Sequence, residues 1–193
     1  MMIGSGNLPD SLTGGILLAV VATAAVFDIR WRKIPNWLTL SGMTAGLALK
    51  TLLHGFAGLR LSAEGLALGF GIYLLFYWLR AMGAGDVKLM AAVGAIAGPV
   101  LWFNIFLAAS VASGILAVCL SLVKGRFRQT LWNVGYLTVE LLHFRRPYYK
   151  HPELDVKSGH ALKLPHGVAI AAGVAACMAL PGVQSGIAYF WNR

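Results

Sequence analysis

Two of the seven acidic residues stand where a long apolar stretch meets polar sequence. Asp28 closes the apolar run of residues 12–27, and Asp86 opens the run of residues 87–97. An ionised carboxylate at membrane depth is costly, so such residues usually mark functional sites. Two carboxylates about 3 Å apart share one proton, and one then activates a water while the other polarises a carbonyl. The alternative is that each aspartate only caps a helix or pairs with a neighbouring basic residue.

Glycines precede the second of these acids, in the segment Gly83-Ala84-Gly85-Asp86-Val87-Lys88. Glycine permits tight turns and the close approach of another chain. A peptidase that binds an extended substrate needs such room beside its acid. The other interpretation is a flexible turn before a helix whose N-cap is Asp86.

The elements that carry these acids are predicted to be membrane-spanning helices. The chain is 58% hydrophobic and only 12% charged, and a soluble protein of this size could not bury so much apolar surface in one core. A span needs about 20 mainly apolar residues, fewer if neighbours bury it. We therefore predict an all-α membrane protein, a bundle of about six transmembrane helices at residues 12–27, 37–53, 61–79, 87–97, 100–123 and 164–191. A short connection, residues 54–60, joins the second and third helices.

The basic residues predict the orientation of this bundle. The formal net charge of +9 would suggest nucleic acid in a soluble protein, but here the basic residues lie between the apolar runs. Thirteen of the 16 fall on one side if the loops after the first, third and fifth helices share that side. Because cytoplasmic loops carry the excess of Lys and Arg, both termini are predicted to be non-cytoplasmic. Asp28 and Asp86 then lie at the same, cytoplasmic, end.

The chain is predicted to form a single polytopic membrane domain, residues 1–193, with a cytoplasmic basic loop at about residues 124–163. Within this loop, residues 131–144 suggest an amphipathic helix at the membrane interface. Cys119 and Cys177 form no CxxC motif, which makes a zinc or disulfide framework an unfavoured interpretation. The histidines of the loop region match no compact ligand spacing, so no metal site is predicted.

Three segments together resemble the type IV prepilin peptidase family. The segment Asp28-Ile29-Arg30-Trp31-Arg32-Lys33-Ile34-Pro35-Asn36 resembles the first active-site segment, an Asp at a helix end followed by basic residues and Ile-Pro-Asn. The segment from Gly83 to Lys88 resembles the Gly-x-Gly-Asp-x-Lys segment that carries the second catalytic Asp. Leu164-Pro165-His166-Gly167 resembles a third segment, usually Pro-Tyr-Gly, near the start of the last span. The order and separations of the segments are also similar to those of the family.

The resemblance implies an intramembrane aspartyl endopeptidase that removes the short basic leader of prepilin-like proteins at the cytoplasmic membrane face. It would sit in the bacterial inner membrane, work without a cofactor and bind the leader and the start of the hydrophobic helix of a prepilin or pseudopilin, with membrane lipid around it. Asp28 and Asp86 would be the catalytic pair. The residues implied to shape the site are Gly83, Gly85, Lys88, Pro35, Asn36, Pro165, His166 and Gly167.

The chain departs from the family pattern in two places. Larger bifunctional members carry a cytoplasmic insert with paired CxxC motifs between the first two spans and also N-methylate the new terminus. The loop here is too short for that insert, so the chain resembles the short branch, which includes enzymes for Flp-type (tight-adherence) pilins. The other departure is His166, which stands where the family usually has Tyr and which, unlike Tyr, titrates near neutral pH. Its plain interpretation is a polar residue at a helix start.

Two other functions are compatible with the same residues. A proton-coupled carrier could use Asp28 and Asp86 as proton sites, although such carriers typically have inverted repeats and broken helices at the midplane. A non-catalytic scaffold for pilus assembly is the second alternative. Turnover of a prepilin separates both from the peptidase.

Overall fold

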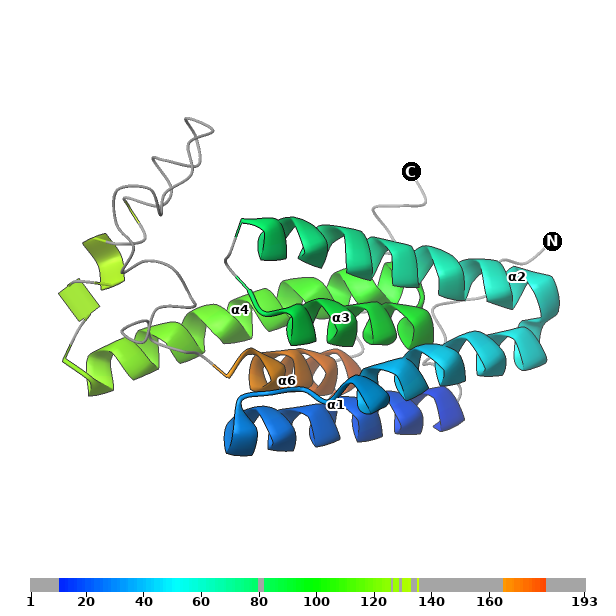
Figure 1. Cartoon of the computed structure of the whole chain (residues 1–193), viewed down its shortest axis with the longest axis horizontal. Helices are drawn as coiled ribbons and strands as arrows, with labels where there is room; N and C mark the ends of the chain where they lie inside the picture. Colours follow the sequence, from blue (N-terminus) through cyan, green and yellow to red (C-terminus); the bar gives the residue numbers. More distant parts are fainter. Residues whose placement is uncertain are drawn as a thin grey trace.

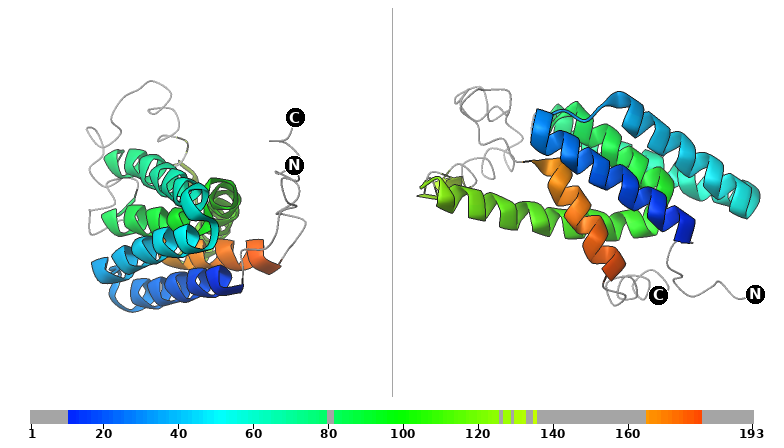
Figure 2. Two further views of the ribbon diagram at one scale, coloured as in Figure 1. Left: turned by 90° about the vertical axis from the view of Figure 1, so that its right-hand side faces the viewer. Right: turned by 90° about the horizontal axis from the view of Figure 1, so that it is seen from below.

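The structure is a computed structural model that describes residues 11–79, 82–125, 127–128, 130–132, 135 and 165–179. Its helices are α1 (Ser11–Trp31), α2 (Asn36–Trp78), α3 (Ala84–Ala97), α4 (Pro99–Val123) and α6 (His166–Ala179). One layer contains α1, the two halves of α2 and, between those halves, α3, while α4 and α6 pack against one face of this layer (Figures 1 and 2). The described residues contain no strand, and the predicted all-α class is confirmed.

The first helix carries Asp28 in its last turn and ends in an unusual backbone conformation. The Arg32 N–H donates to the Asp28 carbonyl oxygen at 3.0 Å, and Arg32 has a φ of 53°. A left-handed residue after the last turn is a common way to end a helix, but it is uncommon for a residue other than glycine. The chain then passes through an extended Pro35, with φ −68° and ψ 140°, which is the N-cap of α2.

Helix α2 is a hairpin of two helical halves that reverses at Gly55. Gly55 has φ 61° and ψ −143°, a conformation that residues with a Cβ rarely adopt. The first half runs away from the end of α1 and the second half runs back (Figure 1). The prediction of a connection at residues 54–60 was therefore too wide, because the helix resumes directly after Gly55.

Close backbone contacts hold α3 between the two halves of α2. A Cβ added at Gly46 would lie 2.7 Å from the carbonyl carbon of Ala95, and a Cβ added at Gly42 would lie 3.2 Å from the Cβ of Ala92. On the other side Gly65 and Gly94 face each other so closely that a Cβ on either would meet the carbonyl of the other. Small residues at a helix interface permit this approach, which favours helix association in membranes.

Hydrogen bonds from side chains to helix carbonyl groups add to this packing. Ser62 Oγ in the second half of α2 donates to the Ala95 carbonyl at 2.6 Å. The Lys50 ammonium donates to the Ala97 carbonyl at 3.2 Å, where a cation complements the C-terminal end of α3. At that point Gly98, with φ 81°, ends α3 and Pro99 begins α4, since proline is well suited to the first turn of a helix.

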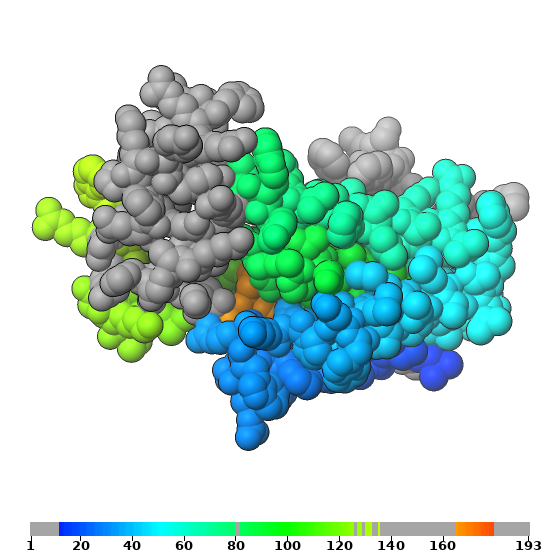
Figure 3. Space-filling view, viewed as in Figure 1, coloured from blue at the N-terminus to red at the C-terminus, as the bar shows by residue number. Residues whose placement is uncertain are grey.

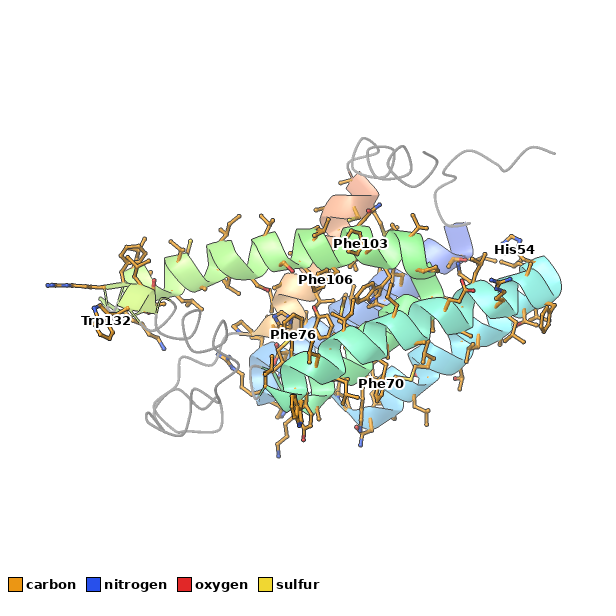
Figure 4. The ribbon with its side chains drawn as sticks, turned by 90° about the horizontal axis from the view of Figure 1, so that it is seen from above. His54, Phe70, Phe76, Phe103, Phe106 and Trp132 are labelled. Carbon is orange, nitrogen blue, oxygen red and sulfur yellow. The ribbon has the colours of Figure 1, made fainter. Side chains whose placement is uncertain are left out.

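The second layer covers α3 with large side chains. Trp102 on α4 is fully buried, and its indole N–H donates to the Met90 carbonyl at 3.1 Å. It stacks on Phe106, with ring centroids 5.4 Å apart. Phe106 and Phe76, both labelled in Figure 4, lie between α4 and α2. Helix α6 packs on α4 through Gly173, where an added Cβ would lie 2.6 Å from the Ala109 nitrogen.

Three helices of the described part are long and apolar enough to cross a membrane, at Leu12–Trp31, Asn36–Trp78 and Pro99–Val123. Helices α3 and α6 have 14 residues each, about 21 Å against a hydrocarbon core of about 30 Å. The count of six spans and the side of each terminus stay predictions. The predicted amphipathic helix at residues 131–144 lies mostly outside the described residues, as do residues 180–191 of the predicted last span.

Candidate functional site

The predicted site residues gather at one end of the bundle, where α1 ends, α2 begins and ends, and α3 and α6 begin. We call this the site end; it is on the left in Figure 1. The other end contains the reversal at Gly55 and the junction at Gly98. In Figure 3 a small area of α6 (orange) reaches the surface between α3 and the blue residues near the end of α1. The alternating helix directions therefore bring segments together that are far apart in the sequence.

Asp28 is buried against the first turn of α6. Its side chain is 8% exposed, and its Oδ2 accepts a hydrogen bond of 2.8 Å from the Gly167 N–H. A carboxylate near the C-terminal end of its own helix is unfavourable, whereas the N-terminal end of another helix favours it. Gly167 permits this contact because an added Cβ would already lie 3.1 Å from the Asp28 Cβ and Oδ2. Residues 139 positions apart thus form one unit.

Asp86 lies in the first turn of α3, half-buried. Its Oδ2 accepts a hydrogen bond of 3.2 Å from the Gly83 N–H, and Gly83 is the N-cap. The interpretation of Asp86 as the N-cap itself was therefore wrong by three residues, although a capping role of its carboxylate is real. The Asp28 and Asp86 carboxylates are close enough to interact electrostatically. Both acids that the sequence singled out lie at the site end.

The remaining residues around Asp86 connect α3 to the start of α2. Lys88 Nζ donates to Asn36 Oδ1 at 2.9 Å, so this hydrogen bond joins two predicted site residues. Gly85 faces Ile34, and a Cβ added at Gly85 would lie 3.3 Å from the Cβ of Ile34. Pro35 precedes Asn36 as the N-cap of α2.

His166 begins α6 and contacts two residues that the sequence did not reveal. Its Nε2 lies 3.4 Å from the Tyr73 hydroxyl on α2, and its Nδ1 lies 3.2 Å from the Ser113 hydroxyl on α4. Tyr73 also interacts electrostatically with Asp86. No local signal marks Tyr73 or Ser113, since each lies in an apolar run without a motif. Pro165, the last predicted residue, precedes His166, and its carbonyl accepts from the Val168 N–H at 3.1 Å.

The side chains at the site end are able to take part in acid–base chemistry. Two carboxylates are held by backbone N–H groups from different helices, and glycines flank both of them. Among the described residues no group of three His, Cys, Asp or Glu side chains could hold a metal ion. The chemistry available from these groups is proton transfer.

A family model, that of the type IV leader peptidase family, matches residues 15–118, more than half of the chain. The chain belongs to this family. The match includes Asp28, Asn36, Asp86 and Lys88 and ends before the segment that contains His166 and Gly167. The family predicted from the motifs is thus confirmed.

Curated relatives carry the description prepilin leader peptidase/N-methyltransferase. The protein from Escherichia coli (strain K12) is 30% identical over 146 residues, which are 65% of this chain and 64% of the relative. The protein from Pectobacterium carotovorum subsp. carotovorum is 33% identical over 110 residues, 53% of this chain and 39% of the relative. The protein from Burkholderia pseudomallei (strain K96243) is 31% identical over 121 residues, 59% of this chain and 38% of the relative. The chain therefore spans less than two thirds of the length of each, and no solved structure matches it.

Proposed function

We propose that the chain is an intramembrane aspartyl endopeptidase that cleaves the short basic leader of type IV prepilin-like proteins. The observation that carries the proposal is the placement of Asp28 and Asp86 at the same end of the bundle. Their carboxylates interact electrostatically, and each accepts a backbone N–H from a helix start, Gly167 for Asp28 and Gly83 for Asp86. The names of the relatives supply the substrate class.

The pair performs the reaction by sharing one proton. The ionised carboxylate takes a proton from a water, and the oxygen of this water forms a bond to the carbonyl carbon of the scissile peptide. The protonated carboxyl donates its hydrogen bond to the carbonyl oxygen, where charge develops. A proton then passes to the peptide nitrogen, the C–N bond breaks, and an acid and an amine leave. Asp28 and Asp86 accept or donate the proton in every transfer. No covalent bond forms between the enzyme and the substrate.

Six membrane crossings are part of the proposal. The two halves of α2 are two of them, because the chain reverses at Gly55. Helices α3 and α6, as described, are shorter than the hydrocarbon core, but neighbouring helices bury most of α3 and one face of α6. Short apolar helices of about 10–14 residues are typically buried inside a protein core. The site end would face the cytoplasm of a bacterial inner membrane, because Arg30 and Lys33 lie exposed beside it.

Leader cleavage without methylation is the activity that we propose. The loop between α1 and α2 consists of residues 32–35, which leaves no room for the CxxC-bearing insert of the larger family members. The two cysteines lie in α4 and α6, with Cys119 exposed and Cys177 buried. These features support assignment to the short branch of the family.

Wild-type chain is expected to shorten a co-expressed prepilin. In bacteria that lack a prepilin peptidase of their own, the prepilin gives a faster band on a gel, and mass spectrometry shows the new terminus without an added methyl group. The same cells with an empty vector are the control. If several prepilins stay uncut while the protein is present in the membrane, the peptidase proposal fails, and the carrier and the scaffold become the better explanations.

Activity is expected to have a single maximum against pH. It falls at low pH, where both carboxyls are protonated and neither accepts a proton from water. It falls at high pH, where both are ionised and neither donates to the carbonyl oxygen. The two limbs belong to the coupled pair, not to either residue. Initial cleavage rates in detergent or nanodiscs across the acid and neutral range test this, and a flat profile there would contradict shared-proton catalysis.

A further inference from the structure

The imidazole of His166 is held from two sides by hydroxyl groups of two different helices. The Tyr73 hydroxyl on α2 lies 3.4 Å from Nε2, and the Ser113 hydroxyl on α4 lies 3.2 Å from Nδ1. The Tyr73 ring also contacts the imidazole, with centroids 5.9 Å apart. The first residue of α6 is therefore fixed to both layers of the bundle.

Tyr73 is itself rigidly held. Its side chain is 1% exposed, and its ring packs edge to face against Phe76 and Phe106 at centroid distances of 6.0 and 6.1 Å. Its hydroxyl therefore has a fixed place in the bundle, set by α2 and α4 together. Aromatic contacts of this kind add to the energy gained from burial of the ring.

The anchored residue is the direct neighbour of the residue that holds Asp28. The Gly167 N–H donates to Asp28 Oδ2 at 2.8 Å, and a Cβ added at Gly167 would be in tight contact with Asp28, at 3.1 Å. The direction of this N–H depends on where the first turn of α6 lies. We propose that Tyr73 and Ser113, acting through the His166 imidazole, position the start of α6 so that the Gly167 N–H is directed at the Asp28 carboxylate.

The chemistry of the three groups explains why a histidine serves here. A neutral imidazole has one N–H donor and one acceptor nitrogen, and each hydroxyl is able to donate or accept. Both contacts are thus satisfied in either tautomer. A tyrosine at position 166 would carry one hydroxyl at the tip of its ring, whereas the imidazole has two separate nitrogens that face Tyr73 and Ser113. The positioning depends on His166 together with hydroxyls at residues 73 and 113.

Substitutions that remove one contact at a time test the proposal. Tyr73→Phe removes the partner of Nε2, and Ser113→Ala removes the partner of Nδ1, while neither changes a residue that touches Asp28. Matched controls are Tyr77→Phe and Ser110→Ala, which alter the same residue types about one turn away at exposed positions of α2 and α4. If a single variant fails to fold, His166→Gln and His166→Asn provide a second route, since their amides replace Nε2 and Nδ1 respectively.

The decisive readout is the amide resonance of Gly167, which does not require enzymatic activity. In glycine-labelled protein in nanodiscs, Asp28→Ala marks the position of the amide without its carboxylate partner. We expect Tyr73→Phe and Ser113→Ala to move the Gly167 resonance toward that position, and Tyr77→Phe and Ser110→Ala to leave it in place. A Gly167 resonance that is unchanged in both test variants would overturn the proposal.

The consequence for catalysis rests on the proposed peptidase function. Since small displacements of catalytic groups lower turnover strongly, we expect kcat for prepilin cleavage to fall about tenfold in Tyr73→Phe and Ser113→Ala, with KM unchanged. The positioning role would be refuted if the wild type cleaves and both variants keep the full kcat, whether or not their KM changes. A wild type that does not cleave would refute the peptidase instead, and the Gly167 resonance would still decide whether the anchor exists.

Discussion

Asp28→Asn and Asp86→Asn are each expected to abolish prepilin cleavage, with a loss of about 10³-fold or more. General acid–base catalysis typically raises a reaction rate about 10²–10⁴-fold. Removal of one member of an acid–base pair should therefore lower the cleavage rate by a factor in this range or more. Asparagine has nearly the same shape as aspartate and keeps an oxygen that accepts the N–H of Gly167 or Gly83. It neither takes a proton from water nor gives one to a carbonyl oxygen. The loss should therefore come from chemistry, with the fold retained.

Cleavage of a purified prepilin by the two variants measures this effect, and membrane levels and thermal unfolding of the variants confirm that they fold. Glu64→Gln is the matched control, because Glu64 is an exposed acid on α2 that pairs with Arg60 at 2.7 Å, away from the site end. It should keep full activity. Substantial cleavage by Asp28→Asn or Asp86→Asn would remove that residue from the mechanism, and equal losses in Glu64→Gln would point to a general effect of charge.

Gly65→Ala and Gly94→Ala are each expected to destabilise the bundle strongly. At each position the added Cβ would meet the backbone carbonyl of the other glycine, and backbone does not yield as a flexible side chain does. Overpacking of a core costs about 1–3 kcal/mol per substitution. Because α3 carries Asp86, separation of α3 from α2 should also lower activity.

Thermal unfolding in detergent and the yield of folded protein measure this effect. Gly71→Ala is the matched control, since Gly71 is an exposed residue of the same half of α2 with no atom within 4 Å of an added Cβ. There, alanine should be neutral or stabilise the helix by up to about 1 kcal/mol. Similar unfolding midpoints for Gly65→Ala, Gly94→Ala and Gly71→Ala would show that the close contact between α2 and α3 does not limit stability.

The strained end of α1 places a basic residue beside the site. Arg32 has a φ of 53°, which costs a residue with a Cβ about 1 kcal/mol or more, and it interacts electrostatically with Asp28. A glycine would end the helix without strain but also without charge. The structure thus combines helix termination and a cation next to Asp28 in one residue.

Local patterns in the sequence were sufficient to predict the class of the fold and the approximate ranges of its described helices, and they singled out Asp28 and Asp86 as candidate residues. The helix ends are marked by the ends of the apolar runs and by Pro35, Gly98 and Pro99. These signals are local, because they depend on the polarity and the backbone geometry of adjacent residues. The sequence could not locate the reversal of α2 better than residues 54–60, since several residues there are compatible with a turn. The structure places it at Gly55, where the backbone requires a positive φ.

Only the tertiary structure decided which groups surround the acids. Gly167 holds Asp28 across 139 positions, and Tyr73 and Ser113 reach His166 across 93 and 53 positions. Nothing local distinguishes this tyrosine or serine from others in apolar runs. Their role depends on how α2 and α4 rotate and pack against α6, and that packing results from contacts such as Gly65 with Gly94 and Trp102 with Met90. Sequence patterns report the solvent preference of each helix, whereas the orientation of each helix is set by side-chain packing among all of them.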